Sequence, residues 1–364
     1  MEKNSKIYVA GHTGLVGSAI LNNLKSKGYT NIIGRDISEL DLTDQQATRE
    51  FFEQEKPEYV ILAAAYVGGI VANNTYRADF IFKNLAIQQN VIGESYRVGV
   101  KKLLFLGSTC IYPCEAPQPM GEDCLLTSPL EYTNEPYAIA KIAGLKMCES
   151  FNIQYGTNFI AVMPTNLYGP NDNFDLEKSH VMPAMIRKVY LAKALNESDW
   201  DSIRKDLAKR PIEGVNGESS EAEITEILSK YGVYNDRVEL WGSGLPTREF
   251  LWSEEMADAC VFVIENVEFA DLKSYAIERG CPSNQIRNCH INIGTGKEIT
   301  IRALAEHIVN VVGYKGNLKF DSSKPDGTMR KLTDPSKIHS LGWHHKIEVE
   351  DGVAKLFEWY KSNL

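Results

Sequence analysis

A tyrosine and a lysine four residues apart, with a serine upstream, are the residues of this 364-residue chain whose types and spacing predict chemistry most directly. Tyr137 and Lys141 stand in the run Tyr-Ala-Ile-Ala-Lys, and Ser108 precedes Tyr137 by 29 residues. An i,i+4 spacing places two side chains on one face of a helix. There the ammonium is expected to lower the phenol pKa and make the tyrosine a usable acid near neutrality.

A glycine-rich turn lies between the first apolar run, at residues 6–10, and a helical pattern that begins at Ser18. Its glycines are Gly11, Gly14 and Gly17, one residue away from the usual G-x-G-x-x-G spacing. Backbone N–H groups at such a strand–turn–helix junction cradle a pyrophosphate, whereas an ordinary tight turn explains the loop taken alone. Small residues at 63–65, after the third strand, leave room for a cofactor near the sheet. With Tyr137, the loop predicts nicotinamide-dependent chemistry at a carbonyl or alcohol.

Composition predicts a cytoplasmic enzyme. A chain of this length with 43% hydrophobic residues buries a large core. A net charge of −9 without a basic block argues against nucleic acid or an anionic membrane as partner. No apolar run approaches the roughly twenty residues of a membrane span, and the N-terminus lacks the apolar core of a signal peptide. Seven irregularly spaced cysteines predict neither disulfides nor a metal site.

Strand and helix patterns alternate up to about residue 165. Apolar runs occur at 7–10, 32–33, 59–62, 103–106 and 159–162, separated by amphipathic segments that include 44–54, 79–98 and 137–155. Near-continuous apolar strands separated by helices predict an α/β fold, with a Rossmann-type doubly wound parallel sheet. We expect a smaller α/β substrate-binding lobe at 171–249 and 297–364, and a nucleotide-binding domain at 1–170 and 250–296. Within the lobe, a helix is expected at 301–312 with Thr300 as its N-cap.

Eight further motifs resemble those of the extended short-chain dehydrogenase/reductases and, among these, of the GDP-L-fucose synthase family. They lie at 67–75, 107–113, 133–144, 164–174, 179–181, 241–244, 248–250 and 324–328. Together they span nearly the whole chain apart from one insertion, and the set is more specific than any single motif. Members of that family epimerise GDP-4-keto-6-deoxy-mannose at C3 and C5 and then reduce the C4 ketone with NADPH.

The resemblance assigns roles to five residues. Tyr137 would donate a proton to the C4 oxygen, Ser108 would hydrogen-bond the same oxygen, and Lys141 would bind the nicotinamide ribose. Cys110 and His180 match the family's epimerisation pair. A thiolate near a cation is a competent base, and imidazole titrates in the range that suits an acid. Taken alone, Cys110 is more typical of a buried small hydrophobe, and His180 of a structural histidine.

The resemblance also implies the binding residues. Positions that contact the GDP-sugar, the expected partner, are Lys188, Trp241, Arg248 and Asp326. An arginine suits a pyrophosphate through paired hydrogen bonds. Expected cofactor contacts are Gly11, Thr13, Gly14, Leu15, Val16, Gly17, Arg35, Asp36, Asp41, Leu42, Ala63, Ala64, Ala65, Asn84, Leu106, Gly107, Tyr137, Lys141, Pro164, Asn166, Leu167 and His180.

The cofactor is expected to be NADP(H), with NAD(H) as the alternative. Thr13 and Ile37 stand where family members place arginines that meet the 2′-phosphate. Asp36 lies where a carboxylate binds a free 2′-hydroxyl, which is typical of NAD sites. Against this, the adjacent Arg35 could bind the phosphate.

The family also pairs through two helices, so a homodimer is expected, with 84–98 and 137–153 as the contact segments.

An insertion at 192–237 departs from the shorter family members and leaves the sugar open. Ser198 and Ser220 each begin a helix pattern within it, as N-caps. Related reductases that carry such an insertion act on GDP-6-deoxy-4-keto-heptoses for surface polysaccharide, with or without epimerase activity. A non-catalytic nucleotide-sugar binding protein is a further alternative, although both Tyr137 and Lys141 are retained. A 4,6-dehydratase or 4-epimerase shares Tyr-x-x-x-Lys, but a dehydratase would carry Thr-Asp-Glu at 108–110.

Overall fold

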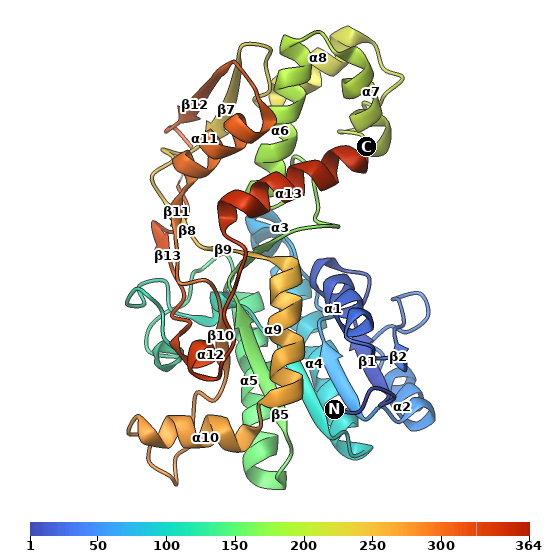
Figure 1. Ribbon diagram of the computed structural model, residues 1–364, viewed down its shortest axis with the longest axis vertical. Coiled ribbons are helices and arrows are strands. Elements are labelled where there is room, and N and C mark those ends of the chain that lie inside the picture. Colours follow the sequence, from blue (N-terminus) through green and yellow to red (C-terminus); the bar gives the residue numbers. More distant parts are fainter. Residues whose placement is uncertain (325) are drawn as a thin grey trace. The chain divides into compact units, whose positions relative to one another are not determined.

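The computed structural model describes residues 1–324 and 326–364, without the side chains of Ile70 and Val71, and the chain forms two compact units (Figure 1). Pro325, in the motif at 324–328, lies outside the described residues. The first unit comprises Met1–Leu167, Leu251–Gly296 and Leu332–Lys346; the second comprises Tyr168–Phe250, Lys297–Lys331 and Ile347–Leu364.

The expected assignment of 297–364 to the second lobe is therefore wrong for residues 332–346. This segment carries α12 (Ser336–Ser340), which packs against β10 (Ile291–Ile293) of the first unit. The Met120 N–H donates to the Leu332 carbonyl at 2.8 Å, which ties the start of the segment to the same unit. Its short apolar pattern gave no sign of these distant partners.

A six-stranded parallel sheet forms the first unit, in the order β10-β5-β4-β3-β1-β2, and confirms the doubly wound α/β fold. Besides β10, the strands are β1 (Ile7–Ala10), β2 (Ile32–Ile33), β3 (Tyr59–Leu62), β4 (Lys102–Leu106) and β5 (Phe159–Pro164). All five expected strands are present. Since parallel strands end at the same edge, the loops that follow β1, β3, β4 and β5 gather there.

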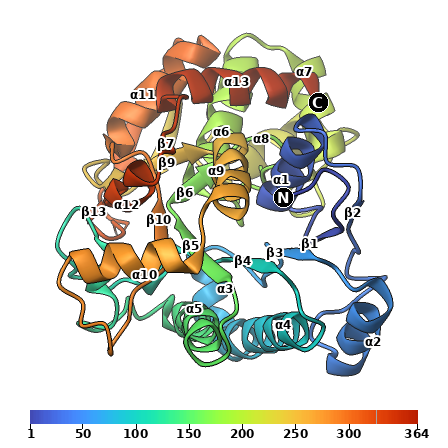
Figure 2. The same ribbon diagram turned by 60° about the horizontal axis from the view of Figure 1, so that its bottom comes forward.

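Helices cover both faces of this sheet (Figure 2). One face carries α1 (Leu15–Ser26) and α9 (Ser253–Asn266); the other carries α2 (Gln45–Glu55), α4 (Arg77–Arg97) and α5 (Glu135–Tyr155). Side chains alternate along each strand, so Ile7 and Val9 join the core under α1 and α9, while Tyr8 and Ala10 join the opposite core. Burial on both faces explains why the strands read as continuous apolar runs. The unit also contains α3 (Ile70–Thr75) and α10 (Phe269–Glu278).

A buried lysine joins the start of β4 to the end of α9. The Lys102 ammonium donates to the carbonyls of Ile264 at 3.0 Å and Val267 at 2.9 Å, and to Glu268 at 2.7 Å. Helices leave their last carbonyls without partners in the helix. Lys102 supplies these partners and thereby fixes α9 against the sheet.

The second unit combines helices with short strands. Its helices are α6 (Val181–Asn196), α7 (Trp200–Lys209), α8 (Glu221–Lys230), α11 (Ile301–Val312) and α13 (Val349–Ser362). Its strands are β7 (Arg237–Trp241), paired with β12 (Asn317–Asp321), and β8 (Thr247–Arg248), which lies between β11 (Ile299–Thr300) and β13 (Arg330–Lys331). Strands β6 (Asn166–Tyr168) and β9 (Phe250–Trp252) pair where the chain passes between the units.

The insertion forms the two expected helices, α7 and α8, although one cap differs. Ser220 caps α8 in a capping box with Glu223, and Thr300 caps α11, both as predicted. The N-cap of α7 is Asp199, whose side chain accepts from the Ser202 N–H, whereas Ser198 adopts a φ of 55°. A carboxylate accepts this hydrogen bond as well as a hydroxyl does. The N-cap pattern in the sequence therefore fitted both Ser198 and its neighbour Asp199. Among the described residues, no helix is both long and apolar enough to cross a membrane.

Candidate active site

The glycine turn after β1 lies directly against the chain after β3. Gly11 has a φ of +81°, and a Cβ placed on it would lie 2.7 Å from the Ala64 nitrogen. A Cβ on Gly17 would lie 2.0 Å from the Gly11 carbonyl oxygen. Only glycine fits at either position, and Gly14 is the N-cap of α1 with no side chain to cover its N-terminus. The first N–H groups of α1, from Leu15 and Val16, are therefore in the arrangement that binds phosphate in this fold.

Four of the five predicted catalytic residues lie together in the first unit. Tyr137 and Lys141 lie one turn apart on α5, with the Lys141 ammonium 5.6 Å from the centre of the Tyr137 ring. Cys110, in the 3-10 helix η1 (Thr109–Ile111), interacts electrostatically with both of them. The Ser108 hydroxyl accepts from the Cys110 N–H at 3.3 Å, which holds the serine at the start of this short helix.

The protonation of Tyr137 differs from the prediction. Burial raises the pKa of Tyr137 above its usual range, and the nearby Cys110 adds to this effect. Burial also lowers the pKa of Lys141, a residue only 3% exposed, to about 8. Its ammonium donates to the Leu106 carbonyl at 2.8 Å. The expected lowering of the phenol pKa by Lys141 is therefore wrong in this state, because burial sets the direction of the shift. Tyr137 keeps its proton at neutral pH, as it would at its ordinary pKa, but it is a weaker acid in this environment than in water.

Five more predicted contacts lie at the same edge of the sheet. Leu106 ends β4 and Gly107 follows it, while Pro164 ends β5, with Asn166 and Leu167 just beyond in β6. The Gly107 N–H donates to the Val162 carbonyl at 2.8 Å. The predicted positions after β1, β3, β4 and β5 thus share one edge, which is where ligands bind in doubly wound sheets.

The residues after β2 have other partners in this structure. Arg35 forms an ion pair with Glu55 at 3.1 Å and donates to the Gly34 carbonyl at 2.9 Å. The exposed Asp36 carboxylate accepts from the Ser38 N–H and hydroxyl, and these bonds lower its pKa. These bonds use one oxygen of the Asp36 carboxylate, so the other oxygen can still accept from a ribose hydroxyl. Arg35 is held beside Glu55, which competes with a phosphate for its guanidinium.

Asp41, Leu42 and Asn84 likewise have structural partners. The exposed Asp41 carboxylate accepts from the Thr43 N–H at 2.9 Å, and Leu42 is buried. The Asn84 amide is buried, accepts from the Tyr66 N–H at 3.0 Å and donates to the carbonyls of Tyr66 and Phe80. Asn84 therefore holds the segment that follows Ala63–Ala65, and its contact with a cofactor stays a prediction. Thr13 lies in the glycine turn.

His180 and Lys188 belong to the second unit, on α6. His180 is the N-cap residue, with no capping bond from its side chain. Its side chain is exposed, yet neighbouring protein displaces enough water to lower its pKa below 6.5. Burial lowers the pKa of the half-buried Lys188 to about 8. No hydrogen bond or ion pair engages its ammonium among residues 1–324 and 326–364, which suits it to an anionic ligand.

Trp241, Arg248 and Asp326 also belong to the second unit, on β7, on β8 and in the loop after β12. Asp326 accepts from the Ser243 N–H at 2.9 Å and hydroxyl at 2.7 Å, just beyond Trp241. Arg248 donates to the Thr328 carbonyl at 2.6 Å, and the charge of Asp326 acts on its guanidinium. The Trp241 ring is 69% exposed, so a flat face is available for a ring to stack on it.

Sequence reasoning missed two side chains at these sites. The Lys324 ammonium lies 5.5 Å from the centre of the Trp241 ring, and its place in the motif at 324–328 was the available signal. The His12 ring packs against Gly34, where a Cβ would lie 2.5 Å from the His12 Cγ. Its position between Gly11 and Thr13 could have suggested this, since the turn after β1 faces the end of β2.

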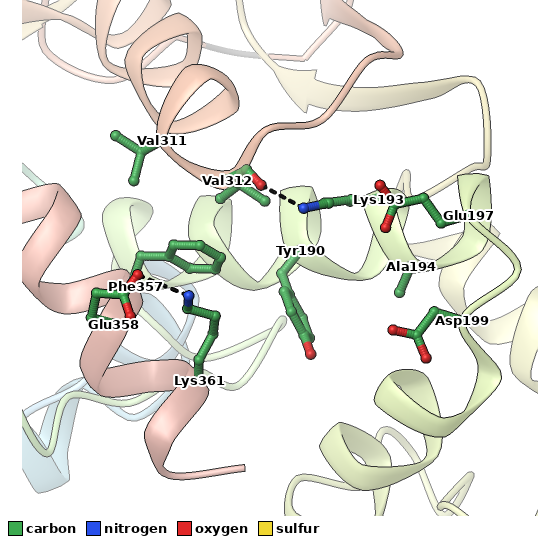
Figure 3. A pocket seen from close by; sticks show the side chains of 10 residues that line it. All are labelled: Tyr190, Lys193, Ala194, Glu197, Asp199, Val311, Val312, Phe357, Glu358 and Lys361. Carbon is green, nitrogen blue, oxygen red and sulfur yellow. Dashed lines mark hydrogen bonds and ion pairs between the residues drawn. The ribbon is translucent and has the colours of Figure 1, made fainter.

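A cavity of about 320 Å³ in the second unit contains none of the predicted site residues (Figure 3). Its lining comes from α6, α11, α13 and the start of the insertion: Tyr190, Lys193, Ala194, Glu197, Asp199, Val311, Val312, Phe357, Glu358 and Lys361. Within the described ranges, no cluster of three or more His, Cys, Asp or Glu residues could hold a metal ion.

Comparison with known proteins agrees with this geometry. Residues 7–206 match the NAD dependent epimerase/dehydratase family. GDP-L-fucose synthase 1 of Arabidopsis thaliana is 49% identical over 363 residues, which cover 100% of this chain and 95% of that protein. A GDP-6-OMe-4-keto-L-xylo-heptose reductase from C. jejuni is 46% identical, with a TM-score of 0.91 over 100% of this chain and 99% of that chain. MlghC, a GDP-mannoheptose C4 reductase from Campylobacter jejuni solved with NADP bound, is 45% identical, with a TM-score of 0.86 and 99% coverage of both chains.

The family match covers more than half of the chain, and the 49% identity to GDP-L-fucose synthase 1 extends over all of it. The chain therefore belongs to the NAD dependent epimerase/dehydratase family, in the branch that contains the GDP-L-fucose synthases.

Proposed function

We propose that the protein is an NADPH-dependent epimerase/reductase that converts GDP-4-keto-6-deoxy-mannose to GDP-L-fucose. The observation that carries this proposal is the placement of Ser108, Cys110, Tyr137 and Lys141 in one cluster of the first unit. The 49% identity to GDP-L-fucose synthase 1 supports the same substrate class. Retention of the Tyr137–Lys141 pair disfavours a non-catalytic binding protein.

The residues around the glycine turn fit a dinucleotide. The close approach of Gly11 to Ala64 leaves backbone rather than side chains at the edge of the sheet, and the N-terminus of α1 is uncapped. The Gly11–Gly17 turn would hold the pyrophosphate, and Lys141 the nicotinamide ribose. When bound, the cofactor supplies a hydride. The NADP-bound reductase from Campylobacter jejuni supports NADP(H), and Arg35, released from Glu55, would bind the 2′-phosphate.

The protein's own groups would handle the protons. In reduction, neutral Tyr137 donates its proton to the C4 oxygen, while the Ser108 hydroxyl hydrogen-bonds the same atom. In epimerisation, Cys110 takes a proton from a carbon next to the ketone and His180 returns one from the other side. The lowered pKa of His180 makes it a ready donor once it is protonated.

The nucleotide would bind the second unit. Lys188 and Arg248 would contact the pyrophosphate, since each carries a cation with restricted access to water. The exposed ring of Trp241 would stack on the guanine, and Asp326 would accept from its N–H groups. Lys324 would add a positive charge beside Trp241.

A second candidate function is C4 reduction of a GDP-6-deoxy-4-keto-heptose, with or without epimerisation. Two heptose reductases align with all or nearly all of this chain at 45–46% identity. The insertion that could reshape a sugar pocket forms α7 and α8, and α7 packs on α6, the helix of Lys188. Ser108, Tyr137 and Lys141 would have the same roles in both reactions.

We also propose a cytoplasmic homodimer. Helices α4 and α5 pack together and leave apolar side chains in solvent, including Phe82, which is 72% exposed, Ile139 and Ile153. The Tyr96 and Tyr155 rings stack across the two helices with their centres 4.5 Å apart. Such a patch is typical of an interface, and seven free cysteines fit a reducing compartment. A monomer in sedimentation equilibrium would contradict the dimer.

Product analysis tests the substrate. The purified protein, given GDP-4-keto-6-deoxy-mannose and NADPH, is expected to form GDP-L-fucose, with stereochemistry read by NMR. The same assay with GDP-6-deoxy-4-keto-mannoheptose and with NADH compares kcat/KM across both sugars and both cofactors. A higher kcat/KM for the heptose would favour the second function, and a higher value for NADH would contradict NADP(H).

Tyr137→Phe is expected to reduce kcat by about 10²–10⁴-fold, because the proton donor is lost. The Kd for NADPH, measured by fluorescence titration, should stay within about twofold since the ring is retained. Tyr155→Phe, at the far end of the same helix, is the control and should behave as the wild type. Full activity in Tyr137→Phe would rule out its role as the acid.

Cys110→Ser is expected to slow the incorporation of solvent deuterium at C3 and C5 by about tenfold or more, while C4 reduction continues. Mass spectrometry measures the deuterium, and a reduced but non-epimerised sugar should accumulate. Cys114→Ser, at an exposed cysteine four residues away, is the matched control. Unchanged incorporation in both Cys110→Ser and His180→Asn would show that the pair is misassigned.

The affinity for GDP is expected to fall as pH rises through about 8, because burial lowers the pKa of Lys188 to about 8 and only its protonated form attracts the diphosphate. Lys188→Met should weaken GDP binding at pH 7 by roughly tenfold and remove this step from the pH profile. Calorimetry over this range measures it, with Lys205→Met, exposed on α7, as the control. A wild-type Kd that does not change across pH 8 would contradict the role of Lys188.

A further inference from the structure

Arg187, which precedes Lys188 on α6, is a fully buried charge of the second unit. Its side chain is 0% exposed and is among the largest fully buried side chains of the chain. Burying a guanidinium is costly unless all its donors are paired. Its partners therefore show which parts of the chain depend on its position.

The insertion supplies the counter-charge. Arg187 donates from Nε and Nη2 to one oxygen of Asp206, at 2.9 and 2.7 Å, and Asp206 on α7 is also 0% exposed. The other Asp206 oxygen accepts from the hydroxyl of Tyr360 on α13. The remaining Arg187 donors bond to the carbonyls of Phe174, at 3.1 Å, and Arg210. One ion pair thus joins α6, α7 and α13.

Aromatic rings close this cluster. The Phe174 ring lies 4.8 Å from that of Tyr360, centre to centre, and stacks on Trp359 at 6.1 Å. The Arg210 guanidinium lies 5.3 Å from the Phe174 ring and 5.1 Å from the Tyr360 ring. Phe174 belongs to the segment that leads to His180, so the same cluster holds both the entry to α6 and its second turn.

The neighbouring side of α6 is in contact with α13 as well. Tyr190 projects from α6 beside α13 (Figure 3), and its ring lies 5.4 Å from that of Tyr360 and 6.1 Å from that of Phe357. Rotation of α6 about its axis would break the Arg187 ion pair and this ring contact together. Because successive residues on a helix are about 100° apart, the orientation of Arg187 fixes that of Lys188.

We propose that Arg187 and Asp206 are positioning residues for GDP-sugar binding. The ion pair sets the rotation of α6 about its axis and its position along that axis, and the position of the Lys188 ammonium follows from both. This inference rests on the proposed function of Lys188 and goes beyond it, since it gives the insertion a defined task. Buried ion pairs add little net stability because desolvation offsets their attraction. A geometric role explains why a buried ion pair stands at a place where two apolar side chains would also pack.

The test measures binding and stability separately. Asp206→Asn is expected to raise the Kd for GDP by about tenfold or more, because a displaced Lys188 no longer meets the diphosphate. The Kd for NADPH, whose proposed contacts lie almost entirely in the first unit, should stay within about twofold. Asp201→Asn, an exposed carboxylate on the same helix, is the matched control and should leave both Kd values unchanged.

A second variant covers the case in which Asp206→Asn does not fold. Arg187→Met with Asp206→Leu replaces both charges by apolar groups of similar length, a change that buried pairs often tolerate in stability. A wild-type Tm with weakened GDP binding supports positioning. A wild-type Kd for GDP in either folded variant overturns the proposal. If instead Lys188→Met binds GDP as the wild type does, the proposed role of Lys188 fails, independently of the ion pair.

Discussion

The contact between two backbone turns at the edge of the sheet is the constraint on which the candidate site depends. Gly11 lies against Ala64, and Gly17 lies against Gly11, with no room for a methyl group in either contact. Strands β1 and β3 are neighbours in the sheet, so the turns that follow them must meet. The N-terminus of α1 is thereby brought to the edge where β4 and β5 end and where Tyr137 and Lys141 face the sheet.

Local pattern was enough to predict the parts that local physics decides. The five early strands are buried on both faces, and their continuous apolar runs show this directly. The helix at 301–312 and its cap at Thr300 were found with the right bounds because the cap, the apolar period and the final Gly313 all lie within one short segment. Tyr137 and Lys141 were identified for a similar reason, since their relation is set by one helical turn.

Features that depend on distant partners were not predictable from pattern. The protonation of Tyr137 is set by the amount of protein around it, not by the nearest lysine. Arg35, in the loop after β2, is paired with Glu55 at the end of α2. Residues 332–346 join the first unit through contacts with residues more than forty positions earlier. Arg187 and Asp206 look like ordinary surface charges in the sequence, and only the fold of the insertion makes them a buried pair.

The order in which the first unit is completed has a consequence for its synthesis. Helix α9, whose end is bound by Lys102, and strand β10, which pairs with β5, both belong to the first unit. They are translated only after all of Tyr168–Phe250. Until they emerge, a nascent chain exposes the apolar face of the sheet around Ile61 and Leu104 and leaves β5 as an open strand edge. Open edges and bare apolar faces are the surfaces on which unfinished chains associate wrongly. The first unit is thus open to wrong association until α9 and β10 have emerged.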